Sequence, residues 1–230
     1  MDIRTASRVA GAVSLIVGSL ALAIPIEITD DDAPIAAQLQ DYANHSALAM
    51  LSNIVLLPVI LMVPAVIYAA RLARRGAPSL AFVGGGLSAL GWLAGFMSIG
   101  TGQIALYQGS KLADQAGAAA LIDKMNGDPV YGTLVGIFVF GHAIGMIVLG
   151  IGLWRSRAVA PWVAALFIAY PVGHLVGHAI SPVVDAISSV LLLVSAVAVA
   201  AKILRIPNEQ WDLPAGEGVA AAEPVAGVAA

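Results

Sequence analysis

Histidine is the side chain of this sequence best suited to bind a metal ion or to transfer a proton near neutral pH. The chain has four, and all of them fall in or at the edge of long apolar segments: His45, His142, His174 and His178. Ionisable groups are costly inside a membrane-spanning segment and commonly mark a functional site there. These histidines are therefore the first candidates for chemistry.

A metal site is one interpretation of the pair His174 and His178. The two residues are four apart, so on a helix both imidazoles lie on one face and can bind one ion or relay a proton. Zinc or copper needs further ligands, for which His45 and Asp185 lie at a compatible depth. The alternative is that each histidine bonds a neighbouring carbonyl or hydroxyl group and only stabilises the bundle. Asp185 also has a purely structural interpretation, because the helix dipole stabilises a carboxylate in the first turn of a helix.

Haem b is a second interpretation, because membrane cytochromes of the b type commonly use two axial histidines from different helices. His174 and His178 share a helix and cannot ligate opposite faces of one haem. The remaining pair is His142 with His174, whose depths differ by about 8 Å at 1.5 Å per helical residue.

Six apolar segments must position these residues, and their approximate ranges are 7–26, 46–70, 79–100, 130–153, 161–180 and 183–203. Each is about 20 residues or longer, which suffices for a helix to cross a hydrocarbon core of ~30 Å. Helices also satisfy their own backbone hydrogen bonds in lipid. The sequence thus predicts an all-α, polytopic transmembrane helical bundle over 1–205. The low-complexity segment 206–230 is predicted to be a disordered cytoplasmic tail.

The distribution of charge predicts the orientation of this bundle. Nine of the eleven Lys and Arg residues lie in alternate gaps between the apolar segments: Arg4, Arg8, Arg71, Arg74, Arg75, Arg155, Arg157, Lys202 and Arg205. Basic gaps face the cytoplasm, so both termini are predicted to be cytoplasmic. Alternatively, the first segment is a signal peptide cleaved near Ala23, which would leave five spans.

Composition excludes several classes of protein. The chain has 230 residues, of which 60% are hydrophobic and 11% charged, and this leaves too little polar surface for a water-soluble globule. A net charge of -3 without a basic stripe makes nucleic acid an unsuitable partner. The absence of Cys excludes disulfides, thiolate metal sites and iron–sulfur clusters.

Pairs of glycines four residues apart indicate close helix packing, since small residues let two backbones approach. The four pairs are Gly91 with Gly95, Gly132 with Gly136, Gly141 with Gly145, and Gly173 with Gly177. They predict a compact bundle, and they are also the faces through which a partner membrane protein or a second copy would pack.

The stretch GHAIGMIVLGIGLWRSRAVAPWVAALFIAYPVGHLVGH (141–178) and the opening RTASRVAGAVSLI resemble small, uncharacterised multi-pass membrane proteins of high-GC actinobacteria. The resemblance implies a bacterial plasma (inner) membrane protein and carries no established activity. The HxxxH pattern is also similar to that of zinc-dependent membrane hydrolases of the ceramidase and adiponectin-receptor type. Those have seven spans and a Ser–Asp pair that has no identified counterpart here.

These observations predict an integral membrane protein that binds a metal ion or another small ligand at a histidine cluster in the outer half of the bilayer. The first alternative is a non-catalytic accessory or scaffolding subunit. A haem b redox protein, a small transporter and a zinc-dependent membrane hydrolase are further alternatives. Whether the protein is an enzyme stays open, because a helical bundle hosts many unrelated activities.

Overall fold

The computed structural model of the protein describes residues 2–24, 26, 28–30 and 32–211, without the side chain of His178. This part of the chain is helical and contains no strand, which confirms the predicted all-α class. Its α-helices are α1 (Ile3–Leu22), α2 (Ile35–Asn44), α3 (Ser46–Leu56), α4 (Met62–Ala73), α5 (Pro78–Gly109), α6 (Gln115–Asn126), α7 (Pro129–Arg155), α8 (Pro161–Ile180), α9 (Pro182–Arg205) and α10 (Asn208–Trp211), with a 3-10 turn, η1 (Leu57–Leu61), between α3 and α4.

Five helical segments of the described chain are long and apolar enough to cross a membrane: Ile3–Leu22, Ser46–Ala73, Pro78–Gly109, Pro129–Arg155 and Pro182–Arg205. They coincide with five of the six predicted spans. The remaining predicted span, 161–180, corresponds to α8, of which Pro161–Gly177 counts as a shorter apolar helix. A multi-pass helical membrane protein is therefore supported by length and composition.

The second predicted span is not a single α-helix. It begins at Ser46 as α3, tightens into η1 around Pro58 and continues as α4. Proline lacks the amide proton that an α-helix needs at that position, and its ring clashes with the preceding turn. The 3-10 segment is the local consequence of that residue.

Helix α5 is longer than its prediction of 79–100. Its 32 residues correspond to roughly 48 Å at 1.5 Å per residue, more than a hydrocarbon core of ~30 Å. The additional turns carry a second small hydrophobic core, in which Leu39 of α2 packs with Ala118, Ala119 and Ile122 of α6. The Ala-rich segment after α5 is thus folded against α2 and α5.

The main core lies between the long helices, and α5 and α7 make its closest contact. A Cβ on Gly91 would overlap the backbone of His142, and one on Gly145 would overlap the backbone of Ser88. These two glycine pairs therefore pack as the sequence predicts. A Cβ on Gly132 or Gly136 would meet no atom within 4 Å, so that pair is not used within the described chain.

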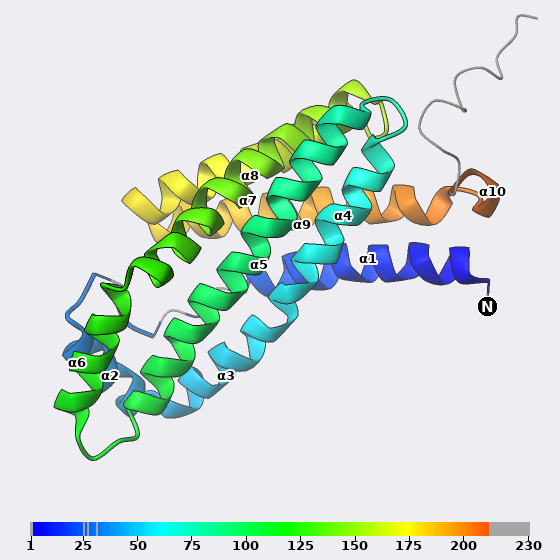
Figure 1. The fold of residues 1–230 in the computed structure, drawn as a ribbon. Coiled ribbons are helices and arrows are strands. Elements are labelled where there is room, and N and C mark those ends of the chain that lie inside the picture. The colour runs from blue at the N-terminus through cyan, green and yellow to red at the C-terminus, as the bar shows by residue number, and fades with distance from the viewer. Residues whose placement is uncertain (1, 25, 27, 31, 212–230) are drawn as a thin grey trace, which may run out of the picture.

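The two ends of the bundle differ in charge (Figure 1). The N-terminus, α10 and the α4–α5 and α7–α8 connections lie at one end, whereas α2 and α6 lie at the other. We call the first the basic end, because it holds the nine basic residues that predicted the orientation. The opposite one, with Asp30, Asp32, Asp114, Asp123 and Asp128, is the acidic end. Figure 1 also shows α1 and α9 crossing the layer of α4, α5 and α7 at an angle.

The structured chain extends beyond the predicted boundary at residue 205. Trp211 is only 2% exposed, stacks on Tyr68 with ring centroids 6.3 Å apart, and lies beneath the guanidinium of Arg71 at 4.6 Å. Its indole donates to Ser7 Oγ at 3.2 Å, and Arg8 donates to the carbonyl of Leu204 at 2.9 Å. Residues 206–211 thus belong to the fold, while the rest of the predicted tail lies outside the described residues.

Candidate functional site

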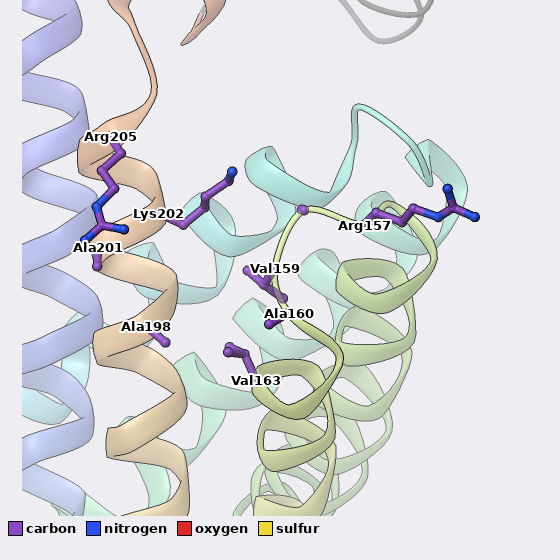
Figure 2. Close-up of a pocket in the computed structure, with 9 residues that line it drawn as sticks. Arg157, Val159, Ala160, Val163, Ala198, Ala201, Lys202 and Arg205 are labelled. Carbon is purple, nitrogen blue, oxygen red and sulfur yellow. The ribbon is translucent and has the colours of Figure 1, made fainter.

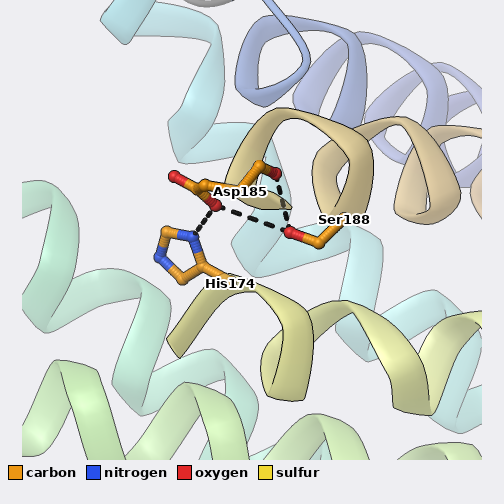
Figure 3. Close-up of polar contacts among 3 residues, drawn as sticks. All are labelled: His174, Asp185 and Ser188. Atoms are coloured by element: carbon orange, nitrogen blue, oxygen red, sulfur yellow. Dashed lines mark hydrogen bonds and ion pairs between the residues drawn. The ribbon is translucent and has the colours of Figure 1, made fainter. Parts of the chain in front are cut away.

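A histidine–aspartate pair joins α8 to α9 near the acidic end of the bundle. Ser181 alone separates the two helices, and Pro182 begins α9, so the chain folds back and places His174 opposite the first turn of α9. His174 Nδ1 lies 2.5 Å from Asp185 Oδ1 (Figure 3). This distance is that of a short, charge-assisted hydrogen bond. With Nδ1–H directed at the carboxylate, Nε2 is the ring atom left to meet a ligand.

Ser188 lies beside Asp185 on α9 and bonds its backbone. Its hydroxyl donates to the backbone carbonyl of Asp185 at 2.7 Å and lies 3.5 Å from the Oδ1 atom that faces His174 (Figure 3). The backbone of Asp185 is therefore held in the first turn of α9 and by Ser188, and its carboxylate is oriented by His174. A carboxylate that is oriented before a ligand arrives loses less conformational freedom on binding.

Two glycines of α8 make this pairing geometrically feasible. A Cβ on Gly177 would overlap the backbone of Asp185, and one on Gly173 would lie 2.8 Å from Ser188 Cβ. Even an alanine at either position would push α8 and α9 apart by roughly the size of its methyl group. The Gly173 and Gly177 pair, predicted as a packing motif, thus also positions His174 opposite Asp185. We call these two residues the His174–Asp185 dyad.

A cavity of about 1010 Å³ opens beside the dyad, and Asp185 lines it. Asp30 and Asp32 line it from the loop after α1, while Tyr42 and Gln103 contribute from α2 and α5. The described lining contains three carboxylates and no lysine or arginine. Such a surface favours a positively charged occupant. The side chains of His174 and Asp185 are 26% and 30% exposed, and Asp185 is the member of the pair that lines the cavity.

Aromatic rings extend from the dyad into the bundle. Tyr170 stacks on His174 with ring centroids 5.6 Å apart, and it also stacks on Trp92 at 6.5 Å. His142 meets the edge of His174 at 5.8 Å and stacks on Phe138 at 4.4 Å. We refer to these five rings as the aromatic–histidine cluster. It packs one face of His174 and so limits the rotamers that this imidazole can adopt.

His142 is the most buried member of the cluster. It is fully inaccessible, and its Nδ1 lies 2.7 Å from the carbonyl oxygen of Phe138. Its Nε2 atom has no hydrogen-bond partner in the described chain, nor does the indole nitrogen of Trp92 or the hydroxyl of Ser88. Buried polar atoms of this kind are commonly satisfied by an internal water molecule.

The structure brings some of the predicted ligands together and separates others. His174 and Asp185 are bonded, and His142 contacts His174. His45 lies apart at the junction of α2 and α3, exposed, with its Nδ1 3.0 Å from the carbonyl of Asp41. The side chain of His178 lies outside the described residues. Within the part of the chain that is described, no three His, Asp or Glu residues form a group that could hold a metal ion.

The predicted haem pairing places its two histidines side by side, but in a geometry unsuited to a porphyrin. The rings of His142 and His174 meet edge to face at an angle of 67°. Phe138 and Trp92 occupy the flanks of His142. A haem between the two imidazoles would need to displace these aromatic side chains, so the residues present do not fit a haem.

The ring packing of Phe138, Tyr170 and Trp92 was not predicted, although the sequence holds a pattern for the first two. Phe138 precedes His142 by four residues, and Tyr170 precedes His174 by four. Residues four apart share a helix face, so each of these histidines is expected to pack on an aromatic ring of its own helix. Trp92, which packs on both Phe138 and Tyr170, has no such pattern and is visible only in the fold.

Comparisons of the chain with protein-family models, curated proteins and solved structures find no match. The resemblance to actinobacterial membrane proteins therefore stays a prediction, and the geometry of the site carries the functional argument.

Proposed function

We propose that the protein binds a small cationic ligand in the cavity at its acidic end, with Asp185 as the counter-charge and His174 as its hydrogen-bonded partner. The observation that carries this proposal is that Asp185, hydrogen-bonded to His174, lines a cavity of about 1010 Å³. Asp30 and Asp32 add negative charge at the same cavity. A cation gains both from these carboxylates and from the weak screening of a partly buried site.

The same geometry favours an organic cation over a metal ion as the ligand. His174 and Asp185 supply two metal ligands, and their direct hydrogen bond occupies one oxygen and one nitrogen. A structural zinc site takes four ligands and a catalytic site three protein ligands. An ammonium group needs only an oriented carboxylate and hydrogen-bond acceptors, which the described cavity offers.

Binding is tested on detergent-purified protein by thermal unfolding with tetramethylammonium, spermidine or Zn²⁺, with the metal content measured by mass spectrometry. We expect an organic cation to raise the unfolding temperature. Asp185→Asn should weaken the binding of spermidine at least about tenfold, because a hydrogen bond to a charged group contributes about 1.5–3 kcal/mol. Asp123→Asn is the matched control, since Asp123 is exposed on α6 and does not line the cavity.

Two outcomes would contradict this proposal. If Asp185→Asn and Asp123→Asn weaken cation binding equally, the effect comes from the overall negative charge of the acidic end and not from Asp185 itself. If the purified protein contains stoichiometric zinc or copper and His174→Ala loses it, the ligand of the site is a metal ion and not an organic cation.

We further propose six spans with both termini in the cytoplasm of a bacterial cell, so that the cavity faces outward. The gathering of the basic segments at one end supports this orientation, since cytoplasmic ends are enriched in Lys and Arg. Because the chain lacks Cys, Arg155→Cys and Lys111→Cys each create a single labelling site. We expect an impermeant maleimide to label Lys111→Cys in intact cells and Arg155→Cys only after lysis. The reverse pattern would invert the topology.

An accessory role is the second candidate, and the uncovered glycine pair of α7 favours it. Gly132 and Gly136 pack on nothing within the described chain, whereas such pairs commonly serve helix association in membranes. If a second copy packs on this face, Gly136→Leu should shift the protein from dimer to monomer in cross-linking experiments. Gly86→Leu is the control, because Gly86 also faces open space but has no glycine partner four residues away. An unchanged cross-linking pattern in Gly136→Leu would exclude association through this face.

A further inference from the structure

A second cavity lies at the basic end, between the start of α8 and the last turns of α9. Its volume is about 450 Å³. Val163, Ala198 and Ala201 form an apolar floor, and Lys202 stands above it with Arg157 and Arg205 on either side (Figure 2). The cavity thus has an apolar floor between the two helices and a cationic rim at the end of the bundle.

The rim cations are not engaged by the protein itself. Arg157, Lys202 and Arg205 are exposed and make no hydrogen bond or ion pair with the described chain, and no acidic residue is part of the described lining. Arg8 and Arg71 at the same end behave differently, because they donate to the carbonyls of Leu204 and Trp211. Basic residues at this end therefore divide into those that hold the fold together and those available to an external anion.

Arg157 adds a conformational observation. Its φ angle is 53°, in the left-handed region that non-glycine residues seldom adopt. Glycine would take this conformation at lower cost. The chain therefore has an arginine at a position where backbone conformation alone favours glycine, which is consistent with a requirement for its charge.

We propose that this cavity binds an anionic phospholipid of the membrane leaflet at the basic end. The headgroup phosphate would contact Lys202, Arg157 and Arg205, and an acyl chain would lie along the floor toward the hydrocarbon core. Basic pockets between transmembrane helices on the cytoplasmic side have this lipid chemistry. The apolar floor favours the lipid over a soluble phosphate, because a free anion would leave the half-buried Ala198 and Ala201 uncovered.

The test is native mass spectrometry of the full-length, detergent-purified protein titrated with phosphatidylglycerol, phosphatidylcholine or inorganic phosphate. We expect phosphatidylglycerol adducts to survive at activation energies that remove phosphatidylcholine, and inorganic phosphate not to bind. The triple variant Arg157→Gln, Lys202→Gln, Arg205→Gln should lower phosphatidylglycerol affinity on the order of 100-fold, since each basic residue near the surface contributes roughly fivefold. The control removes equal charge outside the cavity lining, at Lys111, Lys124 and Arg155, all replaced by Gln.

Two further variants keep the proposal falsifiable if the triple variant fails to fold. Arg157→Gly removes one charge and relieves the left-handed strain, so it should weaken phosphatidylglycerol binding without lowering the unfolding temperature. Ala198→Phe fills the floor and should weaken phosphatidylglycerol binding while all the charges remain. Equal losses in the control, equal retention of phosphatidylcholine, or binding of inorganic phosphate as tight as that of phosphatidylglycerol would each overturn the proposal. The last result would assign the cavity to a soluble anion.

Discussion

The α5–α7 and α8–α9 interfaces are both built on glycines four residues apart, yet the histidine at the first is buried and the histidine at the second is partly exposed. Between α5 and α7, glycines lie on both helices, the backbones meet directly, and His142 is fully buried. Between α8 and α9, Gly173 and Gly177 face Ser188 and Asp185, and the dyad beside them is partly exposed. The same packing motif therefore closes one interface and leaves a partly exposed His–Asp pair at the other, depending on what faces the glycine.

The largest effect is expected from a side chain inserted between α5 and α7. Gly91→Val would place two methyl groups against the backbone of His142, and neither helix can move without separating the other close contacts of the interface. We expect a loss of about 3 kcal/mol or more in the free energy of unfolding, at the upper end of overpacking costs. Denaturant unfolding in detergent measures it.

Gly86→Val is the control for this prediction, since a Cβ at Gly86 meets nothing within 4 Å. The two substitutions have the same helix propensity cost, so their difference isolates packing. Similar stability of both variants would show that the α5–α7 contact is looser than described.

A smaller loss of stability, with a larger loss of binding, is expected at the α8–α9 interface. Gly177→Ala places one methyl group against the backbone of Asp185, so the first turn of α9 must shift away from His174. We expect a loss of about 1–3 kcal/mol in stability together with at least about tenfold weaker binding of the organic cation. Thermal unfolding with and without tetramethylammonium or spermidine separates the two effects.

Gly86→Ala controls for the helix propensity of alanine, because it adds the same methyl group in open space. If Gly177→Ala bound the cation as well as the control did, the spacing of α8 and α9 would not govern the site.

The smallest effects, of opposite sign, are expected from two fully buried serines. Ser195 on α9 donates to the carbonyl of Val163 on α8 at 2.9 Å, and the hydroxyl of Ser88 on α5 has no partner in the described chain. Ser195→Ala should destabilise by about 0.6 kcal/mol, the average for interhelical hydrogen bonds in membranes. Ser88→Ala should be neutral or stabilising, because it removes an unsatisfied buried group.

Equilibrium unfolding of both serine variants under identical detergent conditions makes this comparison. A destabilising Ser88→Ala would show that an internal water molecule satisfies the hydroxyl, and would add a hydration site to the α5–α7 interface.

Several features of the fold could be predicted from single segments. Helix α8 occupies the predicted range 161–180, and α7 and α9 differ from theirs by one or two residues at each end. These boundaries follow from prolines at the first helical positions and from the apolar length of each segment. The extension of α5 and the short α10 were missed, because residues outside the apolar runs are ordered there by contacts with distant parts of the chain.

The candidate site was predicted in part. Placing His174 and Asp185 at similar depth required only helical rise and the tight connection at Ser181. Placing His45 at the same rim used the same reasoning, yet the structure locates it apart from the dyad, at the junction of α2 and α3. Depth along a helix does not specify how that helix is rotated toward its neighbours or how far apart two helices lie across the bundle, and one segment of sequence fixes neither quantity.

The sequence by itself determined that this chain is a bundle of apolar helices with charge divided between its ends, because hydrophobic length and charge placement are properties of each segment alone. Only the tertiary structure decided which histidine meets a carboxylate, which is buried among aromatic rings, and which glycine pair stays uncovered. Those outcomes depend on how helices distant in sequence rotate and pack against one another, and a close contact exists only once both surfaces are in place.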